Sequence, residues 1–443
     1  MRTQIRVIQF SRRKCVPRAK GVSHQVLIAL LVRGFGAGAS FALSLVVARV
    51  LNTTEAGLFF IAFTIVSAGS RVASMGMPTA ILKVVGANEH SDWGLINNVI
   101  GVAHRRIAAI GFLVVCVASW LSASIANYIF GKPMLATLLP ITSLCVFLLA
   151  LLQVLASAIQ GRHRAGISSF VLNSVFPLVI IIGTGILVAL GLSIDARSLV
   201  LLLVSGLLVA LAIASIVWWR DSRSRWTPFA KPDVSFNRSV IYLSPIVIMD
   251  IVVQWSGYFL GSAMLSSTDM AIFSTAQRTA MLGSLLLIGV NLVVAPKFSA
   301  AFTKSDMRQI KQLSRQSNRL MLIAATPFVA LILAFPSMWM GFFGAEYERG
   351  SALLQILTLG QFINLLTGSV GYLLMMTNHE RDYRNIVLLT GPFAIGLAFV
   401  LTNFFGVVGA AIATAVAVAT QNLLAVYMVK KRLGFNTLSF FSP

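Results

Sequence analysis

The stretch LNTTEAGLF at residues 51–59 is followed 214 positions later by LSSTDMAIF at residues 265–273. In both stretches an acid, a small residue and a phenylalanine keep the same spacing. A fainter echo relates GRHR at 161–164 to NHER at 378–381, at nearly the same offset. Chance similarity between short segments is one explanation. Two matches at nearly one offset favour the other, a chain built from two related halves.

The composition of the chain places these halves in a membrane. Of 443 residues, 57% are hydrophobic and only 11% are charged, and the mean hydropathy is +0.87. A soluble domain of this length needs more charge on its surface. Apolar runs of about 20 residues, the length that spans a bilayer, recur throughout. The strands of an outer-membrane barrel would alternate apolar and polar residues instead. The sequence therefore predicts an all-α polytopic membrane protein.

Twelve membrane-spanning helices are predicted from the apolar runs. They are 24–48, 57–82, 107–130, 136–159, 168–191, 198–219, 240–263, 270–296, 320–342, 352–376, 386–404 and 408–429. The boundary between the last two is the weakest, because only a short Asn-Phe-Phe-Gly stretch divides them. No connection is long enough to hold a separate folded domain.

A basic linker divides the twelve spans into two sets of six. The predicted parts are a basic tail 1–23, a first lobe 24–219, the linker 220–239, a second lobe 240–429 and a tail 430–443. Because each half has an even number of spans, the two repeats keep the same orientation. We therefore expect two six-helix lobes related by a pseudo-two-fold axis along the membrane normal, with the binding site between them.

The net charge of +22 is explained by topology rather than by nucleic acid. Of the 35 lysines and arginines, only Arg49, Lys132, Arg197 and Arg349 fall in predicted outer loops. Positive residues concentrate on the cytoplasmic side of membrane proteins, so both termini are predicted to be cytoplasmic. The basic segments also suit contact with anionic membrane lipids. The first apolar run is too long for a cleavable signal peptide, and we expect it to be retained.

Three arginines lie inside predicted spans, namely Arg33, Arg71 and Arg278, against one acid at comparable depth, Asp250. A charge at membrane depth costs a few kcal/mol, so it usually faces a partner or a water-filled cavity. The surplus of cations predicts a cavity that receives an anion, with Arg33 and Arg278 as its first candidates. Arg71 lies nearer the cytoplasmic end of its span, and partial snorkelling to the headgroups is an alternative for it. The planar guanidinium suits a phosphate group, although a carboxylate or sulfate would be served equally well.

Asp250 and Gln254 are four residues apart, hence on one face of the seventh span. Asp250 is a candidate counter-ion for Arg33, a candidate protonatable coupling site, or a member of a purely stabilising ion pair. The remaining polar side chains within spans are candidates for a sugar path, although hydrogen bonds between helices explain them equally well. They are Gln153, Asn173, Gln254, Gln277, Asn291, Gln361 and Asn364.

No catalytic constellation is found in the sequence. The five histidines fall at span ends or in cytoplasmic segments and have no metal-ligand spacing, and the three cysteines imply neither a disulfide nor a metal site. A Gly-rich phosphate loop of the Walker type is absent, and so are paired carboxylates at an outer face. The sequence predicts a protein that is not an enzyme and needs no cofactor or metal.

Several segments resemble one known family. ARVLNTTEAGLF at 48–59 resembles the "A-R-hydrophobic-L-G-x-x-x-[YF]-G" signature after the first span of polysaccharide flippases, which belong to the multidrug/oligosaccharidyl-lipid/polysaccharide exporter superfamily. IFSTA at 272–276 is similar to its "G-x-Y-x-x-A" signature, and VAP at 294–296 to the end of its eighth span. The segments 360–361 (GQ) and 371–378 (GYLLMMTN) resemble its tenth-span pattern. The order of the motifs agrees throughout.

The sequence departs from the family pattern at two points. Asn52 stands where the family usually has glycine, and QWSG at 254–257 replaces the acidic-basic pair common late in the seventh span. The second departure puts in doubt any coupling role carried by that pair.

The resemblance implies two lobes forming a V that opens alternately to each side of a bacterial inner membrane. It implies an undecaprenyl-pyrophosphate-linked oligosaccharide as cargo, exported for O-antigen, capsule or exopolysaccharide. Flippases of this kind often have cavity-facing arginines in spans one, two and eight, which matches Arg33, Arg71 and Arg278 by span. A polysaccharide polymerase and a chain-length regulator are candidate partners.

Three other functions remain open. A cation-coupled multidrug exporter would share the fold, but cationic drugs favour buried acids rather than arginines. A lipid II flippase typically has two more spans. A membrane polysaccharide polymerase or ligase, a different class of protein, would be expected to have a large periplasmic loop.

Overall fold

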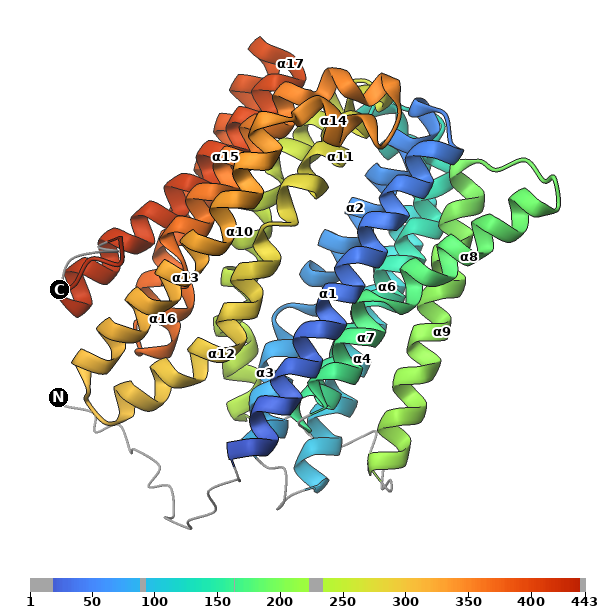
Figure 1. Ribbon diagram of the computed structural model, residues 1–443. Coiled ribbons are helices and arrows are strands. Elements are labelled where there is room, and N and C mark those ends of the chain that lie inside the picture. Colours follow the sequence, from blue (N-terminus) through green and yellow to red (C-terminus); the bar gives the residue numbers. More distant parts are fainter. Residues whose placement is uncertain (1–18, 88–92, 163, 223–233, 439–443) are drawn as a thin grey trace.

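The computed structural model describes residues 19–87, 93–162, 164–222 and 234–438, and these residues contain helices and no strands. Figure 1 shows two groups of helices that meet at one end and diverge towards the other. The first group runs from α1 to α9, and the second runs from α10 to α17. We call them the N-lobe and the C-lobe, and the two ends of the molecule the closed end and the open end.

The N-lobe consists of nine α-helices and one short π-helical turn. They are α1 (Ala19–Val50), α2 (Thr53–Ser74), α3 (Met77–Ala87), α4 (Trp93–Trp120), α5 (Ser122–Ser124), the π-turn η1 (Ile125–Ile129), α6 (Leu135–Gly161), α7 (Ala165–Asn173), α8 (Val175–Ala189) and α9 (Ala196–Ser222). Helix α6 is the centre of this lobe, because α2, α4, α7 and α9 all pack against it.

The C-lobe consists of eight α-helices and one short 3-10 helix. They are α10 (Val234–Met264), α11 (Ser267–Met281), α12 (Ser284–Thr303), α13 (Met307–Ala334), α14 (Pro336–Gly341), η2 (Ala345–Gly350), α15 (Ser351–Thr367), α16 (Val370–Met376) and α17 (Glu380–Leu433). Helix α17 packs along both α10 and α15.

The described residues provide twelve crossings, as predicted. Ten helices are long and apolar enough to span a bilayer, and the pair α11 and α12, bent by 41°, makes an eleventh. Helix α17 is two spans, because the chain reverses at Gly406 (φ 58°). The Arg432 guanidinium lies 2.8 Å from the Asp382 carboxylate, so the two ends of α17 are neighbours. This pair places both ends of the hairpin on one side of the membrane.

Two spans begin more than ten residues earlier than the hydropathy predicts. The third was expected at 107–130, but α4 starts at Trp93 and ends at Trp120, where short turns replace the last predicted residues. The ninth was expected at 320–342, but α13 starts at Met307 and stops before Pro336. Both helices begin with an amphipathic stretch that buries one face against the protein, and average hydropathy does not detect such a stretch.

The internal repeat is visible in the capping of equivalent helices. The Asn52 side chain accepts a hydrogen bond from the Glu55 amide (2.8 Å) at the start of α2, and Ser266 accepts one from Asp269 (3.1 Å) at the start of α11. Asn52 therefore has a clear role where the family usually has glycine, since asparagine is among the best N-cap residues. The repeat predicted from the sequence is confirmed.

The two repeats also touch each other. The Oγ1 atoms of Thr54 and Thr268, which are equivalent positions, lie 3.4 Å apart. A residue can contact its own counterpart only beside the axis that relates the two halves. The pseudo-two-fold axis predicted between the lobes therefore passes between the N-termini of α2 and α11.

The lobes are held together at the closed end. A Cβ at Gly57 would overlap the carbonyl oxygen of Ser267, so the backbones of α2 and α11 are in direct contact. The Lys132 ammonium donates to the carbonyls of Ser262 (2.6 Å) and Leu265 (2.8 Å) at the C-terminus of α10. Arg49 donates to the carbonyl of Phe342 (2.9 Å). Cations are favoured at helix C-termini, so these contacts stabilise the closed end.

Replacing Lys132 with methionine is expected to loosen the closed end. Each charge-assisted hydrogen bond contributes roughly 1.5–3 kcal/mol, so the population with separated outer ends should rise about tenfold or more. Pulsed spin-label distances between the exposed positions Met134 and Met338 would measure this population. Arg349→Met is the control, since it removes an exposed cation from the same end. Equal distance distributions in both variants would contradict the prediction.

Candidate functional site

Arg33 on α1 and Arg71 on α2 line one cavity of about 390 Å³ on the inner face of the N-lobe. Ser67, Ser74 and Gln153 contribute hydroxyl and amide groups to the same cavity. Its lining also includes Gly76, Pro78, Thr79, Leu149, Ser157, Leu172, Asn173, Phe176 and Val247. Val247, on α10, is the one C-lobe residue of this lining.

Breaks in two spans shape this cavity. Helix α2 ends where Met75 (φ 44°) and Gly76 (φ 71°) adopt the left-handed conformation, and α3 starts immediately afterwards. A second break separates α7 from α8 at Asn173 and Ser174. Interrupted spans leave polar backbone groups that are tolerated only where they face protein or a water-filled cavity. Binding sites in transporters are often built at such breaks.

The two cations of this cavity are opposed by one acid of the C-lobe, Asp250, which interacts electrostatically with Arg71. Arg33 is half-buried and Arg71 is exposed towards the cavity. Among the described residues, neither arginine forms an ion pair with a carboxylate. Two arginines that line one polar recess and face the single carboxylate of Asp250 leave an excess of positive charge, which suits an anion.

Asp250 lies in the C-lobe and accepts a hydrogen bond from Gln421 (3.0 Å), which also donates to the Tyr383 hydroxyl (3.2 Å). Within the part of the chain that the structure describes, no ion pair joins Asp250 to Arg33. In this conformation Asp250 therefore belongs to a polar cluster between α10 and α17, and it also interacts electrostatically with Arg71 of the N-lobe.

Arg278 lies apart from the other two arginines. Its Nε donates to the Ser274 hydroxyl (3.1 Å), and its guanidinium lies over the ring of Phe63 (4.6 Å) and less closely over Phe60 (5.3 Å). Both rings belong to α2, so this cation–π contact crosses between the lobes. Phe63 in turn packs on Phe176, a lining residue of the cavity (centroids 6.1 Å apart). The sequence predicted one site for all three arginines. In the structure, the rings of Phe60 and Phe63 separate Arg278 from the cavity that Arg33 and Arg71 line.

Of the residues expected to form a sugar path, Gln153 and Asn173 line the cavity, whereas Gln254, Gln277, Gln361 and Asn364 contact one another. Gln277 is buried and donates to the backbone carbonyl of Gln254 (3.1 Å). Asn364 donates to Gln361 (3.3 Å) on the same helix. None of these four residues lines the cavity with Arg33 and Arg71.

Sequence reasoning missed the serines of the cavity. Ser67, Arg71 and Ser74 occur at helical spacing on one face of α2. That spacing is a readable signal, since residues four and three apart share a helix face. Gln153 of α6 is hydrogen-bonded to α2 beside this face, because its side chain donates to the Ser70 hydroxyl (3.0 Å) and accepts from the Ser74 hydroxyl (3.3 Å).

Two helical lobes around a cavity at membrane depth define a multi-pass membrane transporter. A family model described as "Polysaccharide biosynthesis protein" matches residues 22–302, and a model described as MatE matches residues 245–378. The chain belongs to the polysaccharide biosynthesis protein family, which confirms the resemblance found in the sequence. The matched families are transporters and not enzymes.

A curated relative and several solved structures agree with this assignment. The chain is 24% identical over 395 residues to the probable low-salt glycan biosynthesis flippase Agl15 of Haloferax volcanii, covering 88% of this chain and 79% of that protein. An inward-facing multidrug resistance MATE family transporter of the MOP superfamily has the same fold (TM-score 0.72, 14% identity, 94% and 100% of the two chains covered). So does a MOP superfamily transporter from Pyrococcus furiosus whose pocket is described as having reverse polarity (TM-score 0.69, 14% identity, 93% and 95% covered).

Proposed function

We propose that the protein is a flippase for undecaprenyl-pyrophosphate-linked oligosaccharides. It would move these lipids across the bacterial inner membrane for the assembly of a surface polysaccharide. The observation that carries the proposal is the pair Arg33 and Arg71, which line one cavity and, among the described residues, form no ion pair with a carboxylate. The glycan flippase of Haloferax volcanii, which is similar over most of the chain, supports the same class of cargo.

The chemistry of the cavity suits a diphosphate. Each guanidinium offers parallel N–H donors that match two oxygens of one phosphoryl group. The two guanidinium groups of Arg33 and Arg71 therefore match the two phosphoryl groups of the diphosphate that joins a polyprenol to a sugar. The hydroxyl and amide groups of Ser67, Ser74 and Gln153 are available to the remaining oxygens.

Alternating access would carry the bound headgroup across the membrane. By the distribution of positive charge, the open end faces the cytoplasm, with both termini on that side. Opening of the closed end would part α2 from α11 and release Arg278 from Phe63 and Phe60. Arg278 could then contact the diphosphate on the outer side. Asp250 is the candidate coupling residue, because it is a carboxylate that accepts a hydrogen bond from Gln421 and interacts electrostatically with Arg71 of the proposed headgroup site.

A cation-coupled multidrug exporter is the second candidate, favoured by the MATE fold itself. The charge of the cavity disfavours an exporter of cationic drugs, because two arginines repel a positively charged ligand. A lipid II flippase would use the same diphosphate chemistry. A polymerase and a chain-length regulator would be partners in a polysaccharide pathway.

Reconstitution separates these functions. Proteoliposomes would contain a fluorescent polyprenyl-diphosphate-linked oligosaccharide, and a glycosidase added outside would report its movement between leaflets. We expect the protein to accelerate the exchange over protein-free liposomes, and to leave the distribution of a fluorescent cationic drug unchanged. Drug export without oligosaccharide exchange would overturn the proposed function and support the exporter.

A further inference from the structure

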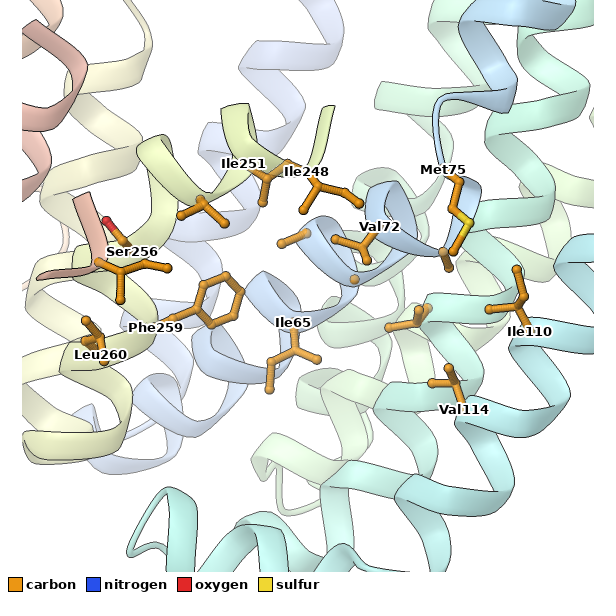
Figure 2. Close-up of a pocket in the computed structure, with 16 residues that line it drawn as sticks. Ile65, Val72, Met75, Ile110, Val114, Ile248, Ile251, Ser256, Phe259 and Leu260 are labelled. Carbon is orange, nitrogen blue, oxygen red and sulfur yellow. The ribbon is translucent and has the colours of Figure 1, made fainter. Parts of the chain in front are cut away.

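A second cavity, of about 600 Å³, lies at the seam between the lobes. Its walls come from α2, α4 and α6 on one side and from α10 and α17 on the other. Figure 2 shows the aliphatic and aromatic side chains of α2, α4 and α10 around it. The Ser256 hydroxyl is the one polar side-chain group of its lining. We call this cavity the seam groove.

We call the cavity lined by Arg33 and Arg71 the arginine cavity. Helix α2 separates the seam groove from it. Ser67, Arg71 and Ser74 line the arginine cavity, whereas Ile65 and Val72 line the seam groove. At 3.6 residues per turn these two sets lie on nearly opposite faces of the helix. The groove and the cavity are therefore one helix diameter apart.

The two cavities approach each other at the break after α2. Met75 lines the groove and Gly76 lines the arginine cavity; on α10, Ile248 lines the groove and Val247 the cavity. The lobes meet here through one cross-lobe hydrogen bond, from the Ser244 hydroxyl to the Met75 carbonyl (2.7 Å). The linings of the two cavities therefore adjoin at the seam between these segments.

A lipid diphosphate has two parts that need different surroundings. Its phosphates need cations and hydrogen-bond donors, and its hydrocarbon tail loses free energy for every methylene that is exposed to water. The arginine cavity is half polar and unsuited to a hydrocarbon chain, whereas the lining of the seam groove is almost entirely apolar. The two parts of such a lipid match the two cavities.

We infer that the seam groove holds the isoprenoid tail of the cargo while its diphosphate occupies the arginine cavity. The tail passes between α2 and α10 beside Met75 and Ser244. This inference rests on the proposed function, because it requires a lipid-linked diphosphate. It adds a tail site and the seam through which the lipid enters.

Photolabelling tests where the tail lies. The probe is a polyprenyl diphosphate with a diazirine in its tail, bound to the full-length protein in nanodiscs. We expect labelled peptides from residues 65–75 and 248–260, and we expect unlabelled polyprenyl diphosphate to suppress them. A diazirine phosphatidylcholine should label these peptides far less. Equal labelling by phosphatidylcholine would assign the groove to ordinary bilayer lipid and overturn the inference.

Labelling confined to α1 and α12 would also overturn it, because the tail would then leave through the opposite seam. This outcome still leaves the proposed function standing, since the probe is bound. Failure of the protein to bind the polyprenyl diphosphate at all would instead reject the proposed function.

A matched pair of substitutions provides a functional test. Val114 of α4 lines the groove, whereas its neighbour Leu113 lies outside this lining and is exposed. Val114→Trp should slow oligosaccharide exchange about tenfold, the factor that corresponds to displacing roughly two methylene groups from an apolar site. Binding of inorganic pyrophosphate should be unchanged. Leu113→Trp should leave exchange near the wild-type rate. Equal rates in the two variants would contradict a tail in the groove.

Discussion

Oxidation of a Thr54→Cys/Thr268→Cys variant is expected to stop transport completely. The two hydroxyl oxygens lie 3.4 Å apart at the closed end, on either side of the pseudo-two-fold axis. A disulfide needs its Cβ atoms about 3.5–4.5 Å apart, a separation compatible with this contact. The bond would hold α2 against α11 and prevent the lobes from parting. Transport by alternating access requires that separation.

The measurement needs a background free of other thiols. Cys116 and Cys145 are free in the structure, and both would be replaced together with Cys15. Exchange of the oligosaccharide lipid should cease on oxidation and return on reduction, and each single cysteine variant should be insensitive to both treatments. Full exchange in a quantitatively cross-linked sample would show that the closed end does not open during transport.

Removing both cavity arginines, in an Arg33→Ala/Arg71→Ala variant, is expected to cause the second large loss. Each charge-assisted contact with a phosphate contributes roughly 1.5–3 kcal/mol, so each arginine should be worth about 10- to 100-fold in binding. The double variant should therefore lose at least about 100-fold in affinity for a polyprenyl diphosphate, and its exchange rate should fall accordingly. Binding in nanodiscs and exchange in proteoliposomes would be measured on the same preparations.

The controls for this variant separate charge from geometry. Arg33→Lys/Arg71→Lys keeps both charges but loses the forked donors, so it should retain part of the affinity. Arg432→Ala removes an arginine that binds Asp382 far from the cavity, and it should leave diphosphate binding unchanged. Wild-type exchange by the double alanine variant, at wild-type expression, would reject the arginine cavity as the headgroup site.

The sequence was sufficient for the spans and the repeat because hydropathy and capping are local properties. Asn52 and Ser266 begin equivalent helices, and their capping role can be read from a few neighbouring residues. The hairpin at Gly406 also follows from the short Asn-Phe-Phe-Gly stretch that divides two apolar runs.

The grouping of the arginines could not be predicted in the same way. Span depth alone put Arg278 with Arg33, but the direction of a side chain around its helix depends on tertiary packing. Phe60 and Phe63 of α2 cover Arg278, and the break at Met75 and Gly76 turns the chain beside Arg71. Neither effect leaves a signal in average hydropathy.

The lining of the arginine cavity has a consequence for the order of events in transport. Val247, its one C-lobe residue, stands 214 positions after Arg33, so the repeat that supplies a cation in one lobe supplies a valine in the other. The two halves share the same fold, but the charge of Arg33 is not repeated in the second half. Under the proposed function, an anion held by Arg33 and Arg71 would keep these contacts while the C-lobe moves relative to it. The headgroup would then stay bound to the N-lobe while access changes from one side of the membrane to the other.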